Sequence, residues 1–141
     1  MDMSDPKLVL HNHLLLESPT LCIYYDTHSD WIYMDWIGQQ TVDSVKEGCE
    51  KLLSFIIAER CHKVLNDNTR VTNIWSDAAI WVAADFFPRA EKAGLQYLAW
   101  VYSPDQFSRL SADEVMLHQT VNIIVIPFNS YEEAQNWLAA V

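Results

Sequence analysis

The chain has 141 residues, of which half are hydrophobic, and its formal net charge is -10 at pH 7. This length suits one domain with one core, and the apolar content without any 18-residue apolar run argues against both intrinsic disorder and a stable membrane anchor. Only nine Lys and Arg residues oppose 19 Asp and Glu residues, so we expect no nucleic-acid partner, because affinity for phosphates depends mainly on basic side chains.

The first residues, MDMSDPK, are acidic and contain a proline where a secretory signal needs basic residues and an apolar segment, which indicates a cytoplasmic protein. Residues 1–12 are predicted to be a flexible or partly ordered N-terminus, and residues 13–141 to form the domain. The three cysteines, Cys22, Cys49 and Cys61, are odd in number and lack CxxC spacing. We therefore predict reduced thiols, no metal site and no cofactor.

The N-terminal third of the chain is predicted to form an antiparallel meander. Residues 14–17 and 21–26 have the composition of strands, and the turn residues 27–30 lead into a third strand at 31–37. Alternate side chains of a strand point to opposite faces, and in this third strand both sets are largely apolar. We therefore place the third strand in the centre of the sheet.

A long amphipathic helix is predicted next, from an N-cap at Thr41 to Arg60. Its apolar residues recur at helical spacing and form one stripe that should pack on the sheet. This stripe consists of Val42, Val45, Cys49, Leu52, Leu53 and Ile56.

A buried strand is then predicted at residues 61–65, followed by a polar segment at 66–70 and by a helix at 77–93. Pro88 has no amide donor, so it should either bend this helix near Asp85 or separate two shorter helices. We expect the bend to leave a concave apolar surface between the helix and the sheet.

The C-terminal part alternates strands and helices. Strands are predicted at residues 95–102 and 121–128, and a Ser-Pro pair should start a short helical turn after the first of them. SADE has the spacing of a capping box and predicts a helix at 112–119, while SYEE predicts a last helix from Tyr131. This order indicates an α/β fold, a single-domain sandwich with a mixed sheet, antiparallel N-terminal strands and about four helices.

The segment from Val64 to Ala78 carries a resemblance to a known family. Val64 and Leu65 correspond to a strand, Val71, Thr72 and Ile74 to an apolar V-T-x-I piece, and Trp75, Ser76, Asp77 and Ala78 fall on a D-S-S-G motif. Together with the order of elements over nearly the whole chain, this segment resembles the STAS domain, in the SpoIIAA-like branch that is grouped with SEC14-type folds. The resemblance implies a SpoIIAA-like STAS sandwich.

The resemblance also implies a non-catalytic regulatory or protein-interaction module, with a protein partner such as a kinase or an anti-sigma-type regulator. The family's phosphoacceptor is the second serine of D-S-S-G. Asp77 occupies that position here and Ser76 precedes it. Asp77 either imitates a permanently charged state or marks a lineage without phosphorylation, whereas an alignment shifted by one residue makes Ser76 the acceptor.

The candidate partner-binding or signalling loop is the polar segment after the buried strand, together with the start of the following helix. Open α/β sheets usually place binding crevices at the carboxyl ends of their strands. The alternative is a local role, in which the polar residues form a turn and Ser76 or Asp77 caps the helix. The candidate residues are Asn66, Asp67, Asn68, Arg70, Ser76 and Asp77.

An apolar ligand pocket beside this loop is an alternative function, because SEC14-like relatives enclose an apolar small molecule or lipid. Binding pockets are mostly apolar with a few polar groups. The residues predicted to line it are Trp75, Trp81, Phe86 and Trp100. The opposing interpretation is that these aromatic side chains simply fill the core.

An enzyme is the weakest interpretation, because no GxSxG, HExxH, P-loop or GxGxxG motif occurs, and we predict no catalytic residues. It would require Asp35, Asp67 and Asp77 to converge in one cleft. A homodimer is a further expectation, since six tryptophans could leave an aromatic patch at the surface.

Overall fold

The computed structural model describes residues 12–141, which form one six-stranded sheet in the order β1-β2-β3-β4-β5-β6. The first three strands are antiparallel and the others are parallel, so the predicted mixed sheet with an antiparallel start is confirmed. The strands are β1 (Asn12–Glu17), β2 (Leu21–Asp26), β3 (Trp31–Gly38), β4 (Lys63–Val71), β5 (Tyr97–Val101) and β6 (Ile124–Phe128). The predicted flexible N-terminus lies outside the described residues, except for Asn12, which begins β1.

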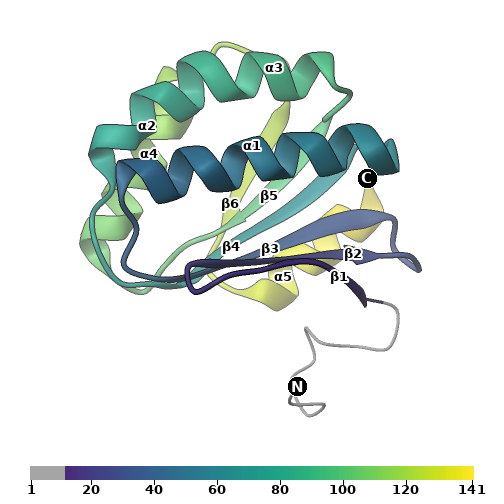
Figure 1. The fold of residues 1–141 in the computed structure, drawn as a ribbon, viewed down its shortest axis with the longest axis horizontal. Coiled ribbons are helices and arrows are strands. Elements are labelled where there is room, and N and C mark those ends of the chain that lie inside the picture. The colour runs from purple at the N-terminus through teal and green to yellow at the C-terminus, as the bar shows by residue number, and fades with distance from the viewer. Residues whose placement is uncertain (1–11) are drawn as a thin grey trace.

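Helices cover both faces of the sheet, but unequally (Figure 1). One face carries α1 (Val42–Glu59), α4 (Gln106–His118) and a continuous helical segment made of α2 (Ser76–Trp81), η1 (Val82–Phe86) and α3 (Phe87–Lys92). Among residues 12–141, α5 (Tyr131–Ala140) is the one helix on the other face. Counting α2 to α3 as one segment gives the predicted four helical segments within the described chain.

Helix α1 is the element that local sequence signals specify best. The Thr41 side chain accepts from the Ser44 backbone amide and the Ser44 side chain accepts from the Thr41 amide, which forms a capping box. Arg60 ends the helix in the left-handed region, with φ of 52°. The predicted helix is thus confirmed, with Val45, Gly48, Cys49, Leu52 and Ile56 buried, but of the predicted stripe Val42 is exposed and Leu53 is only half-buried.

Strand β3 lies between β2 and β4 and contributes to two apolar cores, as its pattern predicted. Ile32, Met34 and Trp36 belong to the large core beneath α1, α2, α3 and α4. On the opposite face, Trp31 and Tyr33 join Leu65 and the inner residues of α5 in a smaller core.

Strand β4 extends through the segment that was predicted to be a loop. Residues 63–71 are all in the strand, so the predicted end at residue 65 is wrong. Asn66 pairs in register with Met34 of β3 and with Trp100 of β5, and Asp67 pairs with Asp35 and Val101. The ladder therefore continues on both sides as far as Asp67, and the Asn66 and Asp67 side chains accept hydrogen bonds from Trp36 and Tyr33 of β3, whereas Thr69 and Arg70 are exposed.

Helix α4 begins earlier than predicted. The Asp105 side chain accepts from the amides of Phe107 and Ser108 and is the N-cap, so the predicted helix start at residue 112 and the separate helical turn before it are wrong. The Ser103 hydroxyl donates to the Val71 carbonyl, which fixes the preceding segment to the end of β4. Ser111, predicted as a cap, lies in the middle of the helix.

The predicted disturbance before Pro88 is present as a π-helical segment. Residues 82–86 form the wider π-helical turn between α2 and α3, and Pro88 stands in the first turn of α3. A proline leaves a gap in the hydrogen-bond ladder of the preceding turn, and a π-helical turn is one way in which a helix accommodates such a gap.

Candidate functional site

The structure divides the six predicted loop residues into a buried set and an exposed set. Asn66, Asp67 and Asn68 are buried in β4, whereas Arg70 and Asp77 are exposed and Ser76 is half-buried. The surface available at this edge of the sheet is therefore formed by the end of β4, by residues 72–75 and by the first turn of α2.

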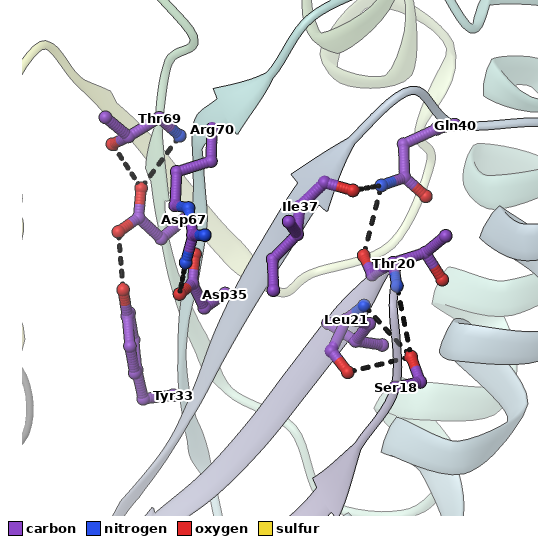
Figure 2. A network of polar contacts seen from close by, with 10 residues as sticks. All are labelled: Ser18, Thr20, Leu21, Tyr33, Asp35, Ile37, Gln40, Asp67, Thr69 and Arg70. Atoms are coloured by element: carbon purple, nitrogen blue, oxygen red, sulfur yellow. Dashed lines mark hydrogen bonds and ion pairs between the residues drawn. The ribbon is translucent and has the colours of Figure 1, made fainter. Parts of the chain in front are cut away.

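Asp67 is the most deeply buried of the predicted site residues and is held by short hydrogen bonds (Figure 2). The Tyr33 hydroxyl donates to Asp67 Oδ2 at 2.6 Å, and the Thr69 amide donates to Asp67 Oδ1 at 2.9 Å. The Thr69 hydroxyl also donates to Oδ1. Burial, and then the charge of Asp67, raise the pKa of Tyr33, so this phenol stays protonated and remains a donor. These contacts fix the end of β4 in place.

The three aspartates of the enzyme hypothesis do not share a cleft. Asp35 and Asp67 are neighbours in the β3–β4 register, and Arg70 Nη1 lies 3.1 Å from Asp35 Oδ2 (Figure 2). Asp77 lies on α2, which packs on the opposite face of the sheet from Tyr33 and Asp67. The convergence of Asp35, Asp67 and Asp77 that the enzyme interpretation requires is therefore not present.

The backbone at the N-terminus of α2 is hydrogen-bonded by a side chain of α4 rather than by a side chain of α2 itself. Trp75 is the N-cap and makes no side-chain cap bond, so the predicted capping by Ser76 or Asp77 is wrong. Instead, the Trp75 amide donates to Ser111 Oγ of α4 at 2.9 Å, and the Ser76 hydroxyl lies 3.2 Å from the same oxygen. Asp77 is exposed in the first turn of α2.

The predicted aromatic pocket corresponds to a small interior cavity between the sheet and the helices α1 and η1. Trp75, Phe86 and Trp100 line this cavity, and the Trp75 and Trp100 rings are stacked with centroids 6.1 Å apart. Trp81 does not line it; its ring stacks on Phe86, and the Lys46 amine lies 5.5 Å from its centroid.

The size of the cavity decides what it can hold. Its volume is about 40 Å³, which corresponds to about three or four water molecules at roughly 10–15 Å³ each. This volume does not accommodate a lipid. The lining is mostly apolar but includes the polar side chains of Gln40, Asn66 and Asn68. Within the part of the chain that the structure describes, the buried Nε1 of Trp100, another lining residue, has no hydrogen-bond partner.

The exposed side of α4 is a feature that sequence reasoning missed. Ile74, from the segment between β4 and α2, and Leu110 and Leu117 of α4 line a groove of about 390 Å³ next to Ser76. The signal was present in the sequence, because Phe107, Leu110 and Leu117 fall on one side of a helix that starts after Asp105. Beginning the helix at residue 112 obscured this spacing.

Two general features bear on the chemistry of the described residues. No three or more His, Cys, Asp or Glu side chains within residues 12–141 are placed to hold a metal ion. No helix in the same range combines the length and hydropathy needed to cross a membrane.

Comparisons with known proteins identify the fold. No protein-family model matches the chain, and no curated protein matches it in sequence. Among solved structures, the anti-sigma factor antagonist SpoIIAA in its unphosphorylated form aligns with a TM-score of 0.55 and 8% identity, over 92% of this chain and 99% of that protein. SiaC of Pseudomonas aeruginosa aligns with a TM-score of 0.47 and 10% identity, over 83% of this chain and 98% of SiaC. The chain therefore has the SpoIIAA-like STAS fold that its sequence resembles.

Proposed function

We propose that this protein is a non-catalytic regulatory module that acts by binding a protein partner. The contact surface is the exposed edge where β4 leads into α2, which presents Arg70, Ile74 and Asp77. The observation that carries the proposal is the position of Asp77, an exposed carboxylate in the first turn of α2, at the place where the resemblance locates a phosphoacceptor. The fold it shares with SpoIIAA supports a partner such as a kinase or an anti-sigma-type regulator.

The partner reads a constant charge in this proposal rather than a phosphorylation switch. A carboxylate near the N-terminus of a helix is favoured by the helix dipole and needs no modifying enzyme. Ser76, the other candidate acceptor, is half-buried and bonded to Ser111, so a phosphate on it would first have to break that contact. We therefore assign recognition to Asp77 and a packing role to Ser76.

The proposal is tested by replacing Asp77 with lysine and comparing it with a matched control. Asp43 is also an exposed aspartate in the first turn of a helix, at the start of α1. A photo-reactive amino acid at the exposed position 72 is used to cross-link partners in a lysate of the source organism, and the products are identified by mass spectrometry. We expect one discrete protein adduct that Asp77→Lys removes and Asp43→Lys leaves intact.

Both variants should unfold at the same denaturant concentration as the wild type, because both positions are exposed. An adduct that persists undiminished in Asp77→Lys would refute the site assignment. The absence of any discrete adduct at position 72 would refute the protein-binding function at this edge.

A further inference from the structure

Helix α4 is amphipathic in an unusual sense. Its fully buried residues are Ser108, Ser111, Ala112 and Val115, of which two are polar, and Met116 is partly buried against the core. Its exposed side carries large apolar residues, with Phe107 53% exposed, Leu110 54% and Leu117 77%. A helix that has finished packing normally shows the reverse distribution. The exposed leucines are thus not required for packing α4 on its own domain.

These leucines belong to a shaped surface rather than to scattered positions. Leu110 and Leu117 lie two turns apart on the same side of α4, and Ile74 lies across from them with 49% of its surface exposed. The groove between them has a volume of about 390 Å³, within the range of roughly 300 to 1,000 Å³ that is common for binding pockets. Exposed apolar side chains that adjoin one another and are flanked by polar residues are typical of interaction sites.

The charges around the groove are negative. Asp113 and Glu114 line it directly, and the exposed Asp77 stands at the start of the neighbouring α2. The one basic residue of α4 apart from His118 is Arg109, whose guanidinium lies 4.2 Å from the centroid of the Tyr102 ring. Arg109 Nη1 also donates to Asn129 Oδ1, so its charge is engaged at the side of α4 that faces β5 and β6.

We propose that the groove between α4 and residues 72–76 binds an amphipathic helix of a protein partner, whose apolar residues enter the groove and whose Lys or Arg residues flank it. The proposal rests on the proposed function and names the chemistry of the partner. Leu110 and Leu117 of the groove are seven residues, or about 10.5 Å, apart along α4, which matches the span of anchors at i, i+3 or i+4 and i+7 of a docked helix.

Charge complementarity selects this occupant over a second copy of the chain. In a symmetric dimer the same patch faces itself, so Asp113 and Glu114 of each copy would meet carboxylates. Like charges facing each other across an interface oppose association, and the net charge of -10 adds to that repulsion. A basic segment of another protein would meet neither the facing carboxylates nor the repulsion from a second negatively charged chain.

The probe for the test is a fluorescein-labelled peptide of about 15 residues, composed of Leu and Lys in amphipathic helical order. A peptide of the same composition in scrambled order, and one with Glu in place of Lys, are the peptide controls. Fluorescence anisotropy measures binding to the wild type, to Leu110→Ser/Leu117→Ser and to Asp113→Lys/Glu114→Lys. Matched protein controls are Ile57→Ser, at a 59% exposed apolar residue of α1, and Glu47→Lys, at an exposed acid of α1.

We expect the ordered Leu-Lys peptide to bind the wild type, and each double variant to weaken binding by about tenfold or more, since central apolar anchors and their flanking charges dominate such interfaces. The two α1 variants should bind like the wild type. Equal binding of the scrambled peptide, or unchanged binding by Leu110→Ser/Leu117→Ser, would overturn the inference.

Light scattering completes the test, because a dimer of the wild type that Leu110→Ser/Leu117→Ser converts to a monomer would assign the groove to a second copy and overturn the proposed occupant. The proposed function is tested apart from this inference. If Asp77→Lys removes the cross-linked partner and the leucine variant retains it, the protein-binding function stands and the groove assignment fails.

Discussion

Helices α1 and α4 lie on the same face of the sheet (Figure 1). They differ in where their large apolar residues lie, because α1 buries Leu52 and Ile56 whereas α4 exposes Phe107, Leu110 and Leu117. The inner side of α1 carries Leu52 and Ile56, and its outer side carries charged residues such as Glu47 and Lys51. The inner side of α4 carries Ser108, Ser111, Ala112 and Val115, and its outer side carries Phe107, Leu110 and Leu117. The difference indicates that α1 stabilises the domain, whereas α4 positions and presents a surface.

The inner side of α4 shows how it positions that surface. Ser111 Oγ accepts from the Trp75 amide, and Ser108 Oγ accepts from Trp75 Nε1 at 3.4 Å. Both hydrogen bonds hold Trp75, the N-cap residue of α2, which lies beside the groove and close to Asp77. Small side chains at 108, 111 and 112 also let the two helices approach closely. Helix α4 therefore supports the N-terminus of α2 with its inner side while its outer side stays available.

The largest expected effect is a difference in the free energy of unfolding between a substitution on α1 and one on α4. Ile56→Ala on the inner side of α1 removes a side chain that is 0% exposed, and we expect it to lower the free energy of unfolding by about 2–5 kcal/mol. Leu110→Ala on the outer side of α4 should change it by less than about 0.5 kcal/mol. Urea denaturation followed by far-UV circular dichroism measures both. Losses of similar size would contradict the division of roles.

Local signals were sufficient to predict α1 because its capping residue, apolar stripe and end all lie within the helix and its flanks. Thr41 and Ser44 bond each other, and the buried residues follow the predicted spacing. The alternation of apolar residues in β3 was equally local, and it correctly placed that strand in the centre of the sheet.

The site was less predictable because its residues are positioned by partners far away in the sequence. Asn66 is buried because Trp36 Nε1 donates to its Oδ1 at 2.8 Å, and Asp67 because Tyr33 donates to it. These partners lie 30 and 34 residues earlier, and a local pattern of Asn and Asp suggests a turn instead. Likewise, Ser111 has the sequence spacing of a helix cap, yet its side chain accepts a hydrogen bond from the amide of Trp75, at the start of α2.

A smaller effect should arise from the polar contact between α4 and α2. Ser111→Ala leaves the buried Trp75 amide without its acceptor, so we expect a loss of about 1–3 kcal/mol in the free energy of unfolding. Ser54→Ala is the matched control, because Ser54 is an exposed serine within α1 that bonds only to its own helix. Urea denaturation followed by tryptophan fluorescence provides the measurement. If Ser111→Ala were as stable as Ser54→Ala, the supporting role of α4 would be refuted.

The smallest effect concerns the charged outer side of α1, where Glu50 forms an ion pair with Arg89 of α3. Hydrogen bonding to Arg89 lowers the pKa of Glu50, so the folded state gains stability from this pair above the usual pKa of glutamate and loses it as the pH falls through the lowered value. Both side chains are more than one-third exposed, and solvent screening limits the gain to less than about 1 kcal/mol. We therefore expect Glu50→Gln to be slightly less stable than the wild type at pH 7, and the difference in free energy of unfolding to shrink below about pH 4. Urea denaturation at pH 7 and pH 3 measures this difference. A larger difference at pH 3 than at pH 7 would contradict the expected stabilisation of the folded state by the ionised Glu50. The expected result would show that charges on the outer side of α1 contribute little to the fold. Helix α1 would then stabilise the domain almost entirely through its inner side.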